Sequence, residues 1–134
     1  KLADKVSPRL MWLCRWIIPV LSLILVPVML YSAMGVSFDM GRIVCSILGI
    51  MFIIIGNYLP KCRRNGVVGI KIPWTLSSDE NWDKTHRFAG FVWIVCGAAA
   101  IVGGWTKPVV AIVALVAMIL LPVVYSGILK HKGI

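Results

Sequence analysis

Four long apolar runs alternate with polar links along the chain. The runs cover residues 16–34, 43–59, 88–105 and 109–129. Each run is close to the roughly 20 residues that a helix needs to cross the hydrocarbon core of a bilayer. Backbone amides in lipid must be hydrogen-bonded within the segment itself, so runs of this length favour helices over barrel strands. The pattern predicts an all-α polytopic membrane protein with four transmembrane helices and one integral membrane domain over residues 1–134.

The links between the runs differ in length. Residues 35–42 join the first two runs and residues 106–108 join the last two, so we expect two antiparallel hairpins. A longer polar segment, residues 60–87, separates the hairpins. Within it, Ser77 followed by Glu80 matches the capping box that begins a helix. A short amphipathic helix is therefore predicted between the second and third spans, and we expect it to continue into the third.

Lys and Arg are distributed unevenly among these links. Of the fourteen, twelve (Lys1 and Lys5 among them) precede the first run, lie in residues 60–87 or follow the last run, and only Arg42 and Lys107 lie in the short links. Cytoplasmic segments of membrane proteins are enriched in Lys and Arg. We therefore predict that both termini and residues 60–87 are cytoplasmic. The net charge of +9 suits segments beside anionic lipid and does not indicate direct nucleic-acid binding.

Glycines recur every seven residues in the second and third runs. A seven-residue period keeps one stripe facing a neighbouring helix, and glycine lets two backbones approach closely. The predicted helix-packing glycines are Gly49, Gly56, Gly90, Gly97 and Gly104. We interpret them as contacts between the second and third helices of a bundle, with a homodimer through the same faces as the alternative.

The polar segment holds the candidate functional residues. On its predicted helix, Trp82, His86 and Trp93 share one face, so His86 should point toward the bundle. Three interpretations of His86 remain open: catalysis, contact with a ligand or peptide, and structural hydrogen bonding. Trp74 is expected either to plug the mouth of the bundle or to anchor at the membrane interface. Asn57 is expected either to line a cytoplasm-facing pocket or to satisfy backbone groups near the end of the second span.

Neither catalysis nor metal binding has a recognisable residue set in this chain. No Ser, Cys or Thr is spaced with His86 and a carboxylate as a nucleophile–base pair would require. One His with scattered carboxylates is a poor metal site. We predict no catalytic residue, no metal site and no cofactor. The adjacent basic residues Lys61, Arg63 and Arg64 fit topology and lipid anchoring.

The polar segment also carries a recognisable motif. The pattern G-N-Y-L-P-K, then P-W-T-L, then W-x-x-T-H-R-x-x-G resembles the signature of the SdpI family of bacterial integral membrane immunity proteins. Two tryptophan motifs at this fixed separation are unlikely to arise by chance. The motif residues predicted to bind a ligand or partner are Asn57, Lys61, Asn65, Pro73, Trp74, Thr75, Trp82, Thr85, His86 and Arg87.

The resemblance implies a non-enzymatic, multi-pass immunity protein of the bacterial cell (inner) membrane. Such a protein would give resistance to a secreted toxic peptide and would sequester a cytoplasmic repressor at the membrane, which is a signalling role. The implied partners are the lipid bilayer, the toxic peptide and the repressor. The alternative is a small-molecule transporter or membrane enzyme with a cytoplasm-facing pocket around His86 and Trp74.

Overall fold

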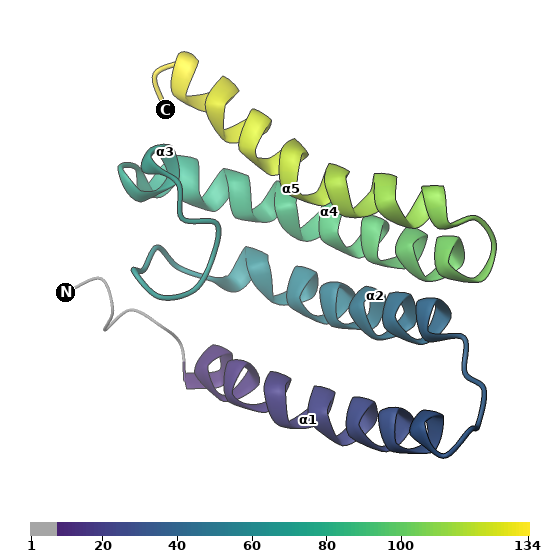
Figure 1. Cartoon of the computed structure of the whole chain (residues 1–134). Helices are drawn as coiled ribbons and strands as arrows, with labels where there is room; N and C mark the ends of the chain where they lie inside the picture. The colour runs from purple at the N-terminus through teal and green to yellow at the C-terminus, as the bar shows by residue number, and fades with distance from the viewer. Residues whose placement is uncertain (1–7) are drawn as a thin grey trace.

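The computed structural model describes residues 8–134, and within that range it contains helices, turns and loops but no strand (Figure 1). Four helices are long and apolar enough to cross a membrane: α1 (Pro8–Ala33), α2 (Met40–Tyr58), α4 (Asp79–Trp105) and α5 (Pro108–His131). The predicted all-α membrane fold with four spanning helices is confirmed. Lys1 and Lys5, which contribute to the predicted charge asymmetry, lie outside the described residues.

The four long helices lie side by side in the order α1, α2, α4, α5, with successive helices running in opposite directions (Figure 1). Helix α4 packs against α2 and against α5. Helix α1 is different, because Leu10 is its one buried residue. Leu10 packs at one end of α1 against Cys62 and Trp82. Helix α4 therefore forms the centre of the packed core, and α1 lies at its edge.

The residue that caps helix α4 lies one position later than predicted. Ser77 ends the single-turn helix α3 (Pro73–Leu76), which begins at Pro73 as helices often do at proline. Ser78 is the residue that caps α4, and its hydroxyl accepts a hydrogen bond from the Asn81 N–H at 3.2 Å. The prediction that Ser77 caps the helix was wrong, because the extra turn of α3 occupies that residue. Helix α4 then continues unbroken to Trp105.

The glycines of α2 and α4 lie where these two helices cross. A Cβ atom added to Gly49 would lie 2.6 Å from the Gly97 carbonyl oxygen, and one added to Gly56 would lie 2.9 Å from the Gly90 carbonyl oxygen. A Cβ at Gly104 would meet Cys45 of α2. Side chains at these positions would force the backbones apart. Because α2 and α4 cover these faces within one chain, the homodimer alternative has no free surface there.

Candidate functional site: a packed loop cap

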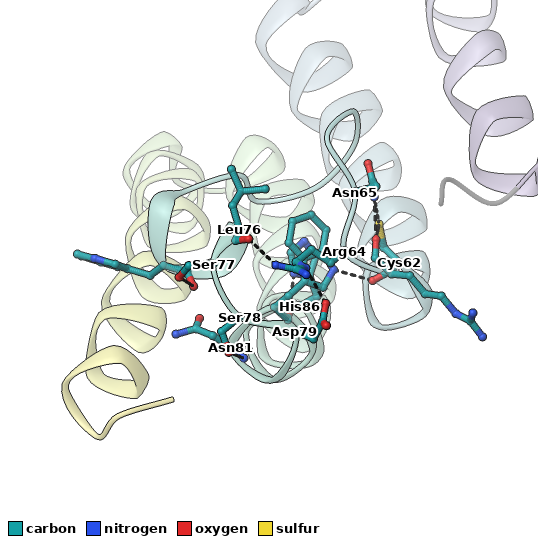
Figure 2. Close-up of polar contacts among 12 residues, drawn as sticks. Cys62, Arg64, Asn65, Leu76, Ser77, Ser78, Asp79, Asn81 and His86 are labelled. Carbon is teal, nitrogen blue, oxygen red and sulfur yellow. Dashed lines mark hydrogen bonds and ion pairs between the residues drawn. The ribbon is translucent and has the colours of Figure 1, made fainter. Parts of the chain in front are cut away.

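Residues 62–78 form a loop that folds over the first turns of α4, and we call this segment the loop cap (Figure 2). It follows the short 3-10 helix η2 (Leu59–Lys61) at the end of α2. Trp82 of α4 holds the start of the loop cap, because its indole Nε1 donates a hydrogen bond to the Cys62 carbonyl oxygen at 2.8 Å. The Trp82 side chain has no exposed surface. The loop cap is therefore tied to α4 through a buried hydrogen bond.

Asn65 organises the first turn of the loop cap. Its Oδ1 accepts hydrogen bonds from the N–H groups of Val67 at 2.8 Å and Val68 at 2.7 Å. Its Nδ2 donates to the carbonyl oxygens of Arg63 at 2.8 Å and Val68 at 3.0 Å. A primary amide has two donor hydrogens and two acceptor lone pairs, so all of its bonding capacity is used. Asn65 is fully buried and has no polar atom left for a ligand.

His86 holds the middle of the loop cap. Its Nε2 accepts a hydrogen bond from the Ile70 N–H at 3.0 Å. Nδ1 must then carry the proton of a neutral imidazole, and it lies 2.9 Å from the Trp82 carbonyl oxygen, to which it donates. The imidazole also stacks on the Trp82 indole, with ring centroids 4.1 Å apart. Because His86 is fully buried and both nitrogens are bonded, the geometry supports structural hydrogen bonding among the three open interpretations.

Gly69 makes this packing possible. Its φ of +129° lies in a region that side chains disfavour. A Cβ there would lie 2.7 Å from the His86 Nε2 and 2.8 Å from the Trp82 ring. The backbone of the loop cap therefore crosses the stacked Trp82–His86 pair at a distance that only glycine allows.

Thr75 stabilises the loop cap internally, and Arg64 joins it to α4. The buried Thr75 hydroxyl donates to the Ile70 carbonyl oxygen at 2.6 Å. Arg64 donates from Nη1 to the Leu76 carbonyl oxygen at 2.7 Å, and its Nε lies 2.6 Å from the Asp79 carboxylate (Figure 2). Sequence reasoning had placed Arg64 with its basic neighbours as a lipid anchor. It missed this role because Asp79 lies fifteen residues away and only the fold brings the two together.

A second buried network lies between α4 and α5. The Asn81 Oδ1 accepts hydrogen bonds from the Ser126 hydroxyl at 2.6 Å and the Thr85 hydroxyl at 3.1 Å. The Asn81 Nδ2 donates to the Ser126 carbonyl oxygen at 3.2 Å. All three side chains are fully buried, where an unpaired polar group would be costly. Ser126 was not among the predicted site residues, although a serine inside an apolar run was a signal that could have indicated it.

The ten predicted binding residues thus divide into two sets. The buried set shapes the loop cap and the start of α4, and consists of Asn65, Thr75, Trp82, Thr85 and His86. The exposed set faces outward, and consists of Asn57, Lys61, Pro73, Trp74 and Arg87. Trp74 keeps 38% of its surface and packs at the edge of α5, where a Cβ on Gly127 would lie 3.0 Å from its ring. The exposed set is the part of the motif that a partner could contact.

The hydrogen bonds of the loop cap hold its surface in a fixed shape. Within residues 8–134, the structure brings no three metal-ligating side chains together. The Cys62 sulfur is a nucleophile only as a thiolate. Burial raises the pKa of the Cys62 thiol, and the hydrogen bond that the Asn65 amide donates to its sulfur lowers the pKa by a smaller amount. The buried imidazole of His86 has no free nitrogen to act as a base.

Comparison with known proteins agrees with the sequence motif. The model of a family described as the SdpI/YfhL protein family matches residues 61–126, which include the whole loop cap and α4. Immunity protein SdpI of Bacillus subtilis (strain 168) is 28% identical over 102 residues, which are 76% of this chain and 49% of that relative. The chain thus spans about half the length of the curated relative it matches. No solved structure matches the chain significantly. The resemblance to the SdpI family is confirmed.

Proposed function

Because the model of the SdpI/YfhL protein family matches residues 61–126, we propose that this chain is a multi-pass membrane immunity protein that gives its cell resistance to a secreted toxic peptide. The family match is the observation that carries the proposal, because it covers the loop cap together with the helices that hold it. The name of the Bacillus subtilis relative, an immunity protein, supports the same function. The four apolar helices fit a protein that works within the membrane.

The proposal includes an orientation. We place both chain ends and the loop cap in the cytoplasm, because twelve of the fourteen Lys and Arg residues lie on that side. The α1–α2 and α4–α5 links then face outward, where a secreted peptide arrives. Trp105 is 59% exposed there, its Nε1 donates to the Ser46 hydroxyl at 2.9 Å, and the Arg42 guanidinium lies 5.3 Å from its ring. This fixed aromatic surface is the proposed contact for the toxic peptide.

The outer surface of the loop cap, with the adjoining ends of η2 and α4, is the proposed contact for a cytoplasmic repressor. Lys61, Lys71 and Arg87 are exposed and basic, and Trp74 adds a half-covered aromatic ring. A partner with acidic and apolar side chains would complement such a surface. The buried set of motif residues supports this role, because its hydrogen bonds hold the exposed set in place.

The alternative of a transporter or membrane enzyme is not favoured. It required an open pocket around His86 and Trp74. Instead the His86 ring stacks on Trp82, the loop cap crosses the pair at Gly69, and none of the His86 surface is exposed.

The test is survival of a toxin-sensitive bacterium that expresses the full chain. Cells are exposed to culture medium from the strain that naturally carries this protein, and membrane abundance is measured in parallel. The proposal predicts survival with the wild-type chain and a reduced survival with Trp105→Ala at equal abundance. No protection from a correctly inserted wild-type chain would refute it.

A further inference from the structure

Helices α1 and α2 are separated by an apolar groove of about 240 Å³. Six residues of α1 and five of α2 line it, and none of the eleven has a charged side chain. They recur at the helical period, so each helix presents a continuous apolar stripe to the other, from Leu13 to Ile24 on α1 and from Ile47 to Ile55 on α2. Leu10 packs in one cluster with Cys62 and Trp82, beyond the end of the groove nearest the loop cap.

The dimensions of the groove indicate what fills it. From Leu13 to Ile24 a helix rises roughly 16 Å, which is about half of a ~30 Å hydrocarbon core. The groove therefore spans one leaflet, on the side of the loop cap. A transmembrane peptide would need the whole thickness of the core. A helix segment of that length also needs roughly 1,200 Å³, whereas the groove holds about 720 Å³ of empty space even when its open side is counted.

The mouth of the groove is basic. Arg9 lies one helical turn before Leu13, on the same face of α1, and is exposed. On the α2 side, Lys61 is exposed and its Nζ lies 5.4 Å from the ring of Tyr58, which itself packs against the Leu10 contact. Residues 8–38 contain no acidic side chain. A negatively charged group at this mouth would therefore be attracted from both helices.

We propose that the groove between α1 and α2 binds an anionic phospholipid of the leaflet on the loop-cap side. One acyl chain lies between the apolar stripes, and the phosphate lies beside Arg9 and Lys61. The lipid fills space that α1 and α2 leave between them and so holds α1 against the rest of the molecule. This inference goes beyond the immunity function and does not depend on it.

Native mass spectrometry of the purified full chain tests the proposal, with dioleoyl phosphatidylglycerol as the anionic probe and dioleoyl phosphatidylcholine as the neutral one. The wild-type chain is expected to retain one phosphatidylglycerol under conditions that remove phosphatidylcholine. Leu21→Trp fills the groove and should abolish that retention. Leu23→Trp is the matched control, because Leu23 is 77% exposed and lies outside the groove, and it should retain the lipid.

A charge test at the mouth is independent of the groove variants. Arg9→Gln and Lys61→Gln should each weaken phosphatidylglycerol binding about fivefold, since a near-surface cation contributes roughly that factor. Lys107→Gln, at the start of α5 in the opposite link, should leave binding unchanged. If Leu21→Trp fails to fold, these surface variants decide the question.

Three results would overturn the proposal. The first is equal retention of both lipids by the wild-type chain. The second is unchanged phosphatidylglycerol binding in a folded Leu21→Trp chain. The third is a lipid-free dimer that Leu21→Trp dissociates, which would assign the groove to a second copy of the chain. A wild-type chain that binds phosphatidylglycerol but gives no toxin protection would refute the proposed function and not the lipid site.

Discussion

Asn65 makes four hydrogen bonds to the backbone from one buried side chain, and this explains the presence of an asparagine in the loop cap. His86 contributes in a similar way, with one nitrogen bonded to the loop cap and the other to its own helix. At the residue scale, the motif therefore specifies a shape. Its buried members make the loop cap rigid, and two of its exposed members, Pro73 and Trp74, lie on the loop cap.

Asn65→Asp should lower the free energy of unfolding. A carboxylate cannot donate to the Arg63 and Val68 carbonyl oxygens, so two buried acceptors lose their partner, and we expect a loss of about 2 kcal/mol. Chemical unfolding in detergent measures this loss. Asn57→Asp makes the same substitution at an exposed site and should change stability little. Equal stability of the two variants would contradict the assigned role of Asn65.

Gly69→Ala should loosen the loop cap. The added Cβ meets both His86 and Trp82, so the loop must move away from α4. Limited proteolysis should then cut the loop cap faster than in the wild-type chain. Gly133→Ala is the control for backbone strain, because Gly133 also has a positive φ (+84°) but nothing within 4 Å of an added Cβ. Cleavage of both variants at the wild-type rate would contradict the close packing assigned to Gly69.

Cys62 should react slowly with thiol reagents. Burial raises the pKa of its thiol, so less of the reactive thiolate is present near neutral pH. In opened membranes, a chain that keeps Cys62 as its one cysteine should be alkylated much more slowly than a chain with only Lys71→Cys, which lies at an exposed site. Comparable rates would show that the loop cap is open.

At the scale of elements, the apolar runs predicted the four long helices, but not all of their ends. Helix α1 begins at Pro8, well before the first run, because Arg9 and Arg15 can extend their long side chains toward water from a helix at the interface. The fold of the loop cap could not be predicted, since Arg64 and His86 take partners that only the tertiary structure brings near. The shared face of Trp82 and His86 followed from helical spacing alone, whereas their stacking did not.

Gly97→Val tests the contact between α2 and α4. A Cβ at Gly97 would lie 2.7 Å from the Gly49 carbonyl oxygen, so a branched side chain should separate the helices. We expect a lower unfolding temperature and a lower membrane abundance. Ala98→Val adds similar volume at the next residue, which is exposed, and should behave like the wild-type chain. If the two variants were equally stable, the close approach of the helices would be in doubt.

At the scale of the whole molecule, the charge distribution and the packing both distinguish the two ends of the helices. The packed core of α2, α4 and α5 carries the loop cap at one end and the Arg42–Trp105 contact at the other. An immunity protein with this orientation would meet a secreted peptide at one surface and a cytoplasmic partner at the opposite one. The proposed function therefore depends on which side of the membrane holds the loop cap.

Cysteine labelling in intact cells measures this most directly. In a chain freed of its native cysteines, Lys71→Cys reports on the loop cap and Lys107→Cys on the α4–α5 link, and both sites are exposed. A membrane-impermeant maleimide should label Lys107→Cys in intact cells, and should label Lys71→Cys only after the membrane is opened. Labelling of Lys71→Cys from outside, with Lys107→Cys protected, would contradict the account.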